Sequence, residues 1–157
     1  YPEEPVQLAN RIPLKGIVHN ETYNDYSKAN INDLVKYGER VENQLESSIP
    51  GAIYKVYMDD THPLGYGTNG VFYNLKQDIT LYEPSNETWN VGVIKKDSYV
   101  TGFVGNKAKA AIQEGIVIGV KDMGAGKFIY MADDPIFRNF WEGGKLILAN
   151  AVFLNGK

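Results

Sequence analysis

The sequence contains no cysteine among its 157 residues. This absence excludes disulfides, thiolate metal sites and a cysteine nucleophile. It does not indicate a compartment, because exported proteins often lack cysteine as well. Histidine is also scarce, with only His19 and His62.

Long apolar runs are missing too. No stretch reaches the roughly 20 apolar residues that a membrane-spanning helix needs, so no membrane span is expected. The first residues, Tyr1 to Pro5, show neither the charged start nor the apolar run of a signal peptide. Because the chain begins with Tyr rather than Met, we expect a fragment or a processed piece of a longer protein.

Neither positive nor negative charge predominates. The net charge is −3 and Lys and Arg form no basic run, which argues against a nucleic-acid surface. What is present favours a globular chain, because 43% hydrophobic and 22% charged residues suffice for a buried core. The length fits one domain.

The stretch 116–154 carries the clearest pattern. Two apolar runs, 116–120 and 127–132, flank the glycines Gly124 and Gly126, which predicts two strands joined by a turn, the first buried on both faces. Asp133-Asp134-Pro135 then predicts a helix start. The apolar residues that follow at helical spacing should face the core; they are Ile136, Phe137, Phe140 and Trp141. Gly143-Gly144 should interrupt that helix, and an apolar helix should resume over 145–153.

Earlier segments alternate strands with turns. Residues 1–14 are expected to be irregular, and an amphipathic, partly buried helix is expected over 31–46. Strands are predicted over 52–58, 71–75, 79–82, 89–94 and 99–104, and a short helix over 107–114.

Five segments follow one another in a recognisable order: IPGAIYKV at 49–56, THPLGYG at 61–67, WNVGVIKK at 89–96, TGFVGNK at 101–107, and DMGAGKFIYMADDPIFRNFWEGGKLILANAVF at 122–153. They resemble the C-terminal domain of zinc carboxypeptidase-like proteins exported by Bacteroidetes-type bacteria. That domain is similar to class I glutamine amidotransferases. The resemblance covers residues 48 to 156, and residues 1–47 match only loosely.

The resemblance implies an α/β fold with three layers around a mixed, flavodoxin-like sheet, of which this chain would hold only part. The strands from Ile116 and Lys127 would be central, and the C-terminal helix would cover one face. The strand-rich middle would make the sheet look more α+β than its relatives. The organisation would be an irregular segment plus helix over 1–47 and an amidotransferase-like portion over 48–157. An incomplete domain would expose a sheet edge, through which chains could pair.

The sequence departs from the family pattern in two ways that bear on catalysis. The family's zinc motif, His-x-x-Glu with a distant His, is absent, because His19-Asn20-Glu21 has the wrong spacing. Amidotransferases use a cysteine nucleophile, which this chain lacks. The expectation is therefore a chain without catalytic residues and without a cofactor of its own, with zinc held in the peptidase domain of the parent.

His62 is the first candidate binding residue. It precedes Pro63 in a turn-rich loop, where it would be a general base or a ligand, or a loop histidine whose ring bonds the nearby backbone. The second alternative is favoured. A metal site formed by His19, Glu21 and His62 would require two distant loops to converge.

Arg138, beside Asp133 and Asp134, is the second candidate. Its guanidinium could clamp a carboxylate or phosphate, or it could form an ion pair that fixes the strand-to-helix turn, which is favoured. Gly124-Ala125-Gly126-Lys127 matches a phosphate loop poorly, because Lys121 and Phe128 occupy two of its defining positions.

Aromatic residues give the third candidate. Trp89, Trp141 and the tyrosines could stack on sugars or peptides, although such residues are more often half-buried strand positions. Two functions remain open. One is a non-catalytic, exported accessory domain that packs on the peptidase domain of its parent or binds an envelope partner. The other is a small-ligand or glycan-binding module around His62, Trp89 and Tyr66.

Overall fold

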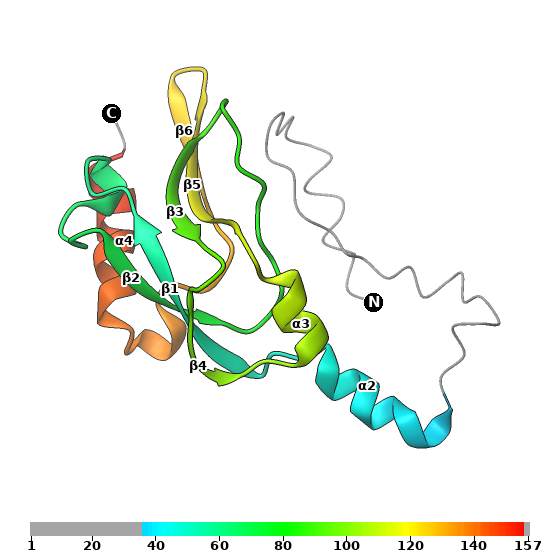
Figure 1. Ribbon diagram of the computed structural model, residues 1–157. Coiled ribbons are helices and arrows are strands. Elements are labelled where there is room, and N and C mark those ends of the chain that lie inside the picture. Colours follow the sequence, from blue (N-terminus) through cyan, green and yellow to red (C-terminus); the bar gives the residue numbers. More distant parts are fainter. Residues whose placement is uncertain (1–35, 156–157) are drawn as a thin grey trace, which may run out of the picture.

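The computed structural model describes residues 36–155, and Figure 1 shows their arrangement. The expectations for residues 1–35, including His19, Glu21 and the start of the first helix, lie outside this range. The described elements are η3 (Tyr37–Glu39), α2 (Arg40–Glu46), β1 (Gly51–Met58), η4 (Pro63–Gly65), β2 (Val71–Lys76), β3 (Trp89–Ile94), β4 (Tyr99–Phe103), α3 (Asn106–Ala111), β5 (Gly115–Met123), β6 (Gly126–Met131), η5 (Phe137–Asn139) and α4 (Glu142–Phe153).

The described strands form one curled sheet in the order β2-β1-β3-β5-β6, with β4 also beside β1. Every pairing within residues 36–155 is antiparallel. The expectation of a mixed sheet is therefore wrong for this part of the chain, while its mixture of helices and strands is confirmed. A short turn makes β5 and β6 antiparallel, because parallel neighbours need long crossovers. The other pairings join strands that longer stretches of chain separate.

β1 is the strand that makes the sheet curl. One of its edges pairs with β2, and its other edge is shared by β4 near Gly51 and by β3 at Tyr57 and Met58. Its side chains alternate between half-buried and buried, as a strand with one covered face requires. Ala52, Tyr54, Val56 and Met58 supply the buried set.

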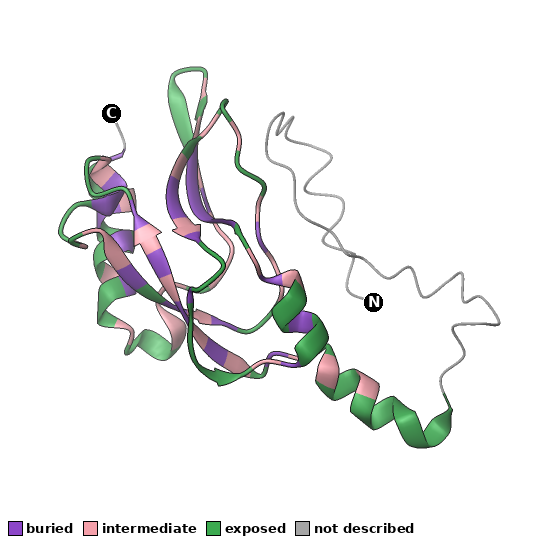
Figure 2. Cartoon of the chain, viewed as in Figure 1, coloured by how far each residue is buried: buried purple, intermediate pink, exposed green. Residues whose placement is uncertain are grey.

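β5 is buried along most of its length. Residues 115–120 are all buried, which confirms the prediction of a strand covered on both faces (Figure 2). Gly124 has φ of +61° in the turn that joins β5 to β6, as predicted. β6, however, is the outermost strand in the order and not a central one. Fully buried side chains such as Val56, Ile94 and Val120 each stabilise the fold by about 1.5–3 kcal/mol.

Residues 133–141 do not form the predicted helix. The Asp134 carboxylate accepts the Ile136 N–H at 2.9 Å, a local bond that competes with helix formation. Arg138 and Asn139 then adopt left-handed backbone angles, with φ of 49° and 58°. The predicted apolar face is consequently not formed, and Phe140 is exposed to solvent.

The last helix, α4, begins at Glu142 and contains Gly143 and Gly144 in its first turn, so these glycines do not interrupt it. A Cβ atom at Gly144 would collide with the Pro135 carbonyl group, and glycine therefore permits this close packing. Further along α4, the side chain of Ile147 is fully buried. The Asn150 amide donates to the carbonyl oxygens of Leu64 at 3.2 Å and Tyr66 at 2.8 Å, which fixes α4 against η4.

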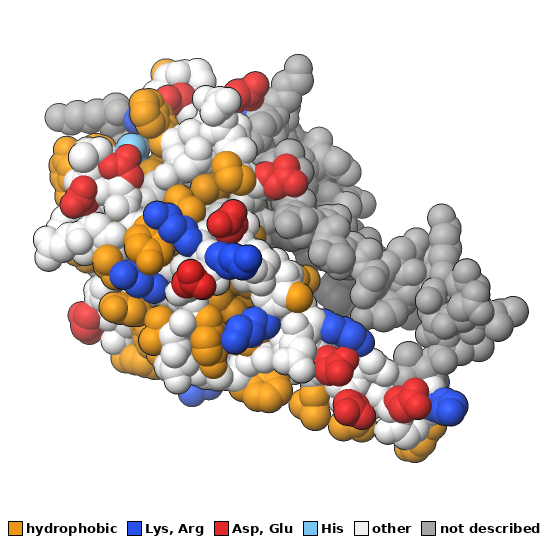
Figure 3. Space-filling view, viewed as in Figure 1, with side chains coloured by type: hydrophobic (Ala, Val, Ile, Leu, Met, Phe, Trp, Pro, Cys, Tyr) orange, Lys and Arg blue, Asp and Glu red, His pale blue; other side chains and the backbone are white. Residues whose placement is uncertain are grey.

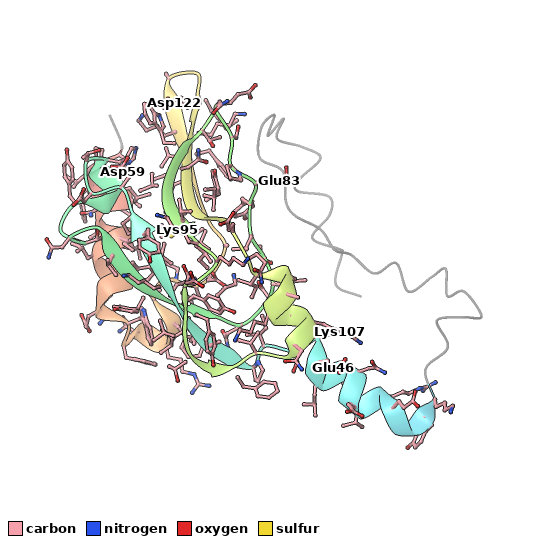
Figure 4. All side chains as sticks on the ribbon, viewed as in Figure 1. Glu46, Asp59, Glu83, Lys95, Lys107 and Asp122 are labelled. Atoms are coloured by element: carbon pink, nitrogen blue, oxygen red, sulfur yellow. The ribbon has the colours of Figure 1, made fainter. Side chains whose placement is uncertain are left out.

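α2 lies at the opposite end of the molecule, beside α3 (Figures 1 and 4). The Lys107 ammonium holds the Glu46 carboxylate at 2.9 Å, which ties the two short helices together. Val41 and Leu45 on α2 are exposed, so the described residues do not cover the apolar stripe that was predicted to be partly buried.

Candidate functional site

The loop between β1 and β2 places His62 at one end of the sheet. Asp59 begins this loop and accepts hydrogen bonds from the backbone N–H and the hydroxyl of Thr61 at 3.0 and 2.5 Å. His62 Nδ1 accepts the Leu64 N–H at 3.1 Å and thereby caps η4. His62 thus bonds nearby backbone, as the favoured sequence interpretation expects. Figure 3 shows a small area of histidine colour at this end of the molecule, with acidic, basic and apolar side chains around it.

The capping bond also defines the chemistry of His62. Nδ1 must be unprotonated to accept the Leu64 N–H, so the neutral ring carries its proton on Nε2. Burial lowers the pKa of His62, and the Asp59 carboxylate opposes this shift. The imidazole is therefore neutral near pH 7 and offers an N–H donor.

Trp89 stands beside His62, with ring centroids 6.1 Å apart and ring planes tilted by 41°. It opens β3 opposite Val120 of β5, and its side chain is 55% exposed. The indole N–H donates to Asp122 Oδ2 at 3.3 Å, and the Lys127 ammonium holds Asp122 Oδ1 at 2.8 Å. Asp122 and Lys127 face each other across the β5–β6 pairing, and Figure 4 shows Asp122 and Asp59 at the same end of the molecule.

Lys127 therefore belongs to this end of the sheet as the partner of Asp122. The segment Gly124-Ala125-Gly126-Lys127 is a hairpin turn between two strands. A phosphate loop would instead lead into a helix whose N-terminus faces the phosphate.

Asp134 and Arg138 form a second group, in the segment that leaves the other end of β6. The predicted ion pair of Arg138 with Asp133 or Asp134 is wrong, because Arg138 forms no ion pair with any residue of 36–155. Its guanidinium lies 5.1 Å from the Phe137 ring centroid. Left-handed backbone at Arg138 turns the chain before α4, and the carboxylate of Asp134 is used locally.

The polar cluster that sequence reasoning missed lies around Asp133. The Lys76 ammonium is fully buried and holds both Asp133 oxygens at 2.9 and 3.0 Å, and it also donates to the Thr80 carbonyl at 2.7 Å. The Asn74 amide donates to Asp133 Oδ2 at 2.5 Å. Burial raises the pKa of Asp133, and the Lys76 ammonium opposes that shift. A signal existed in β2, because Asn74 and Lys76 follow Phe72 at two-residue spacing and therefore share its buried face.

The outer face of α4 is a third notable surface. Leu146, Leu148, Val152 and Phe153 are exposed although the opposite side of the helix packs on the fold; Phe153 is 81% exposed. The charged residues of α4, Glu142 and Lys145, form an ion pair at 2.6 Å in the first turn. The rest of this face is apolar.

Near the start of α4, a hollow of about 400 Å³ is lined by Val71, Phe72, Tyr73, Phe140, Trp141, Glu142 and Gly143.

Two further features, a metal-binding cluster and a membrane-spanning helix, are absent from the described range. Among residues 36–155 no cluster of His, Asp and Glu side chains could hold a metal ion. In the same range, no helix combines the length and the apolar character that crossing a membrane requires.

Comparisons with protein-family models, curated proteins and solved structures find no match for this chain.

Proposed function

We propose that this chain is a non-catalytic accessory domain of an exported zinc carboxypeptidase-like protein, and that the outer face of α4 packs against the peptidase domain of the same polypeptide. One observation carries the proposal: α4 is apolar on both sides. A helix that is hydrophobic all round is normally buried all round. The described residues cover only the side that contains Ile147 and Asn150.

The charge pattern favours an apolar partner surface. Glu142 and Lys145 neutralise each other at one end of α4, so the remaining face carries no charge that a partner would have to match. Val152 and Phe153, exposed by 62% and 81%, would be the main contacts. Large side chains of this kind contribute most of the energy of an interface when they are fully desolvated.

The size of the face favours a partner within the same polypeptide. Its exposed side chains present on the order of 450 Å² of surface, taking usual areas for aromatic and aliphatic side chains. A stable complex between separate proteins buries about 800 Å² on each partner. Domains of one chain associate through smaller surfaces, about 300–750 Å² on each side, because the linker keeps their effective concentration high.

The finer fold assignment belongs to the same proposal. The chain would form part of a class I glutamine amidotransferase-like domain, and the antiparallel sheet would be an addition to the parallel core of that domain. The parent would bind zinc in its peptidase domain and hydrolyse peptide bonds at chain ends with a zinc-activated water. An envelope partner, or a second copy of this chain, is the competing occupant of the α4 face.

The test uses the full polypeptide that carries this chain. Phe153→Asp places a charge on the outer face of α4, and Lys96→Asp adds an acidic residue on an exposed loop as the matched control. We expect Phe153→Asp to lower the melting temperature of the full polypeptide by about 3 °C or more and to reduce its carboxypeptidase activity. The control should change neither, and the 157-residue chain alone should tolerate Phe153→Asp because the ring is solvent-exposed.

Three results would overturn the proposal. The full polypeptide could lack zinc-dependent carboxypeptidase activity altogether. Phe153→Asp could behave like Lys96→Asp. Finally, the 157-residue chain could sediment as a dimer that Phe153→Asp dissociates, in which case a second copy, and not the peptidase domain, covers α4.

A further inference from the structure

Trp89 is an exposed aromatic side chain that is nevertheless held in place. Its indole N–H is bonded to Asp122, and Asp122 is held in turn by Lys127. All three residues lie on paired strands of the sheet, where the backbone is fixed. An exposed indole with a fixed orientation loses little conformational entropy when a ligand stacks on it, which makes it a preorganised platform.

The rim of this platform offers both donors and acceptors. His62 Nδ1 is occupied by the Leu64 N–H, which leaves the ring N–H at Nε2 without a partner among residues 36–155. The Asp122 carboxylate has further lone pairs, and the Lys127 ammonium has further protons. A hydroxyl group donates and accepts at once, so several hydroxyls on one ligand would match such a mixed rim.

Two ion pairs hold most of the charges near Trp89. Lys127 neutralises Asp122, and on the same strand Lys121 lies 3.5 Å from Glu87. Asp59 remains a carboxylate, because its hydrogen bonds with Thr61 lower its pKa, and it leaves one negative charge beside His62. An anion is therefore disfavoured, whereas the hydroxyl groups of an uncharged ligand can donate to the carboxylates.

The tilt between the two rings adds shape. With planes 41° apart and centroids 6.1 Å apart, the imidazole and the indole form a shallow corner rather than one flat surface. A ligand that lies on the indole would have its edge beside the imidazole. The C–H face of a pyranose ring with equatorial hydroxyls suits an aromatic plane, while the hydroxyls at its edge meet polar side chains.

We propose that Trp89, His62, Asp122 and Lys127 form a binding site for an uncharged oligosaccharide built of β-linked pyranose units. The indole of Trp89 carries one sugar ring, and the other three side chains bond its hydroxyls. Asp122 has a second role as a positioning residue, because its bond to the indole N–H sets the plane of the platform. This site does not rest on the proposed packing of α4.

The test follows the two indole N–H signals of the full chain by NMR while cellotetraose or chitotetraose is added to about 10 mM, a range suited to the weak affinity of a single platform. Trp89→Phe and Trp141→Phe assign the signals. We expect the Trp89 signal to shift and the Trp141 signal to stay, because the Trp141 N–H is bonded to the Tyr73 carbonyl at 2.6 Å. Trp89→Ala should weaken binding at least tenfold, and Asp122→Ala three- to tenfold.

Tyr73→Ala is the matched control, because Tyr73 is exposed to a similar extent, 49% against 55% for Trp89, but lies on β2. It should leave binding unchanged. The proposal fails if neither oligosaccharide shifts the Trp89 signal, or if Trp89→Ala binds as well as the unaltered chain. It also fails if tetramethylammonium shifts that signal where the sugars do not, since the site would then bind cations.

Discussion

Two aspartate–lysine pairs in this molecule have nearly the same geometry and opposite surroundings. Asp133 and Lys76 lie 2.9 Å apart with side chains 5% and 0% exposed. Asp122 and Lys127 lie 2.8 Å apart with side chains 58% and 29% exposed. The distance between the charged atoms therefore says little about what each pair does for the protein.

Burial makes the difference. Removing two charges from water is costly, and a buried pair is tolerated only when further hydrogen bonds satisfy it. Asn74 and the Thr80 carbonyl supply these bonds to Asp133 and Lys76. The exposed pair has no such requirement, and water screens it. We infer that the first pair holds β2 to the end of β6, whereas the second orients Trp89.

The largest predicted effect breaks the buried pair. Asp133→Ala leaves the Lys76 ammonium buried without a counter-charge, and we expect it to lower the free energy of unfolding by about 3–5 kcal/mol. Asp122→Ala removes the same chemical group from the exposed pair and should leave that free energy nearly unchanged, because water screens the pair. Urea unfolding followed by circular dichroism measures both.

A double variant separates lost charge pairing from lost volume. Lys76→Met with Asp133→Leu replaces the pair by apolar side chains and should recover most of the stability lost in Asp133→Ala. Asp78→Ala serves as a nearby control, because Asp78 lies 4.0 Å from the Lys76 ammonium but is 60% exposed. Equal losses for Asp122→Ala and Asp133→Ala would refute the assignment of different roles.

The next effect concerns the backbone that leads from Asp133 into α4. A methyl group at Gly144 would meet the Pro135 carbonyl, so Gly144→Ala should destabilise the fold by about 1–3 kcal/mol. A methyl group at Gly143 would meet only the Phe72 ring at 3.4 Å, and Gly143→Ala should stabilise the helix by up to about 1 kcal/mol. Thermal unfolding of the two variants measures this difference. Similar melting temperatures would show that the tight approach is not needed to seat Asp133.

Much of the secondary structure could be predicted from the sequence. The strands β1, β2, β3, β5 and β6 appear close to their predicted bounds, because alternating or continuous apolar runs between glycine and proline signals leave few alternatives. The apolar spacing predicts a helix over 133–141, but this prediction is wrong. In the structure the Ile136 N–H donates to the Asp134 carboxylate, a local bond that competes with helix formation. The direction of the strands could not be obtained from local pattern, because it depends on which strands pair.

The candidate site was only partly predictable. The sequence analysis places His62 and Trp89 in one possible ligand-binding module, but no local pattern indicates that a loop residue and a strand residue far apart in sequence have rings only 6.1 Å apart. Asp122 and Lys127 could have been paired in advance, since a hairpin around Gly124 places them opposite each other. The role of Asp133 depends on burial by β2, a long-range contact that the Asp133-Asp134-Pro135 motif does not indicate.

The smallest effect concerns pH at the exposed end of the molecule. Burial lowers the pKa of His62 in the folded state, so the unfolded state binds more protons just below the usual histidine pKa of about 6.5. The His62 contribution to stability is therefore complete above that pKa and is lost as pH falls through it towards the folded value. His62→Asn keeps an acceptor for the Leu64 N–H without titrating, whereas His62→Ala also removes the cap and should cost about 1 kcal/mol at a pH where the His62 ring is neutral. Between pH 7 and pH 5 the melting temperature of the unaltered chain should fall further than that of His62→Asn. His19 is present in both proteins, so the comparison isolates His62. A difference that does not depend on pH, or that has the opposite sign, would show that the His62 ring is not desolvated beside Trp89.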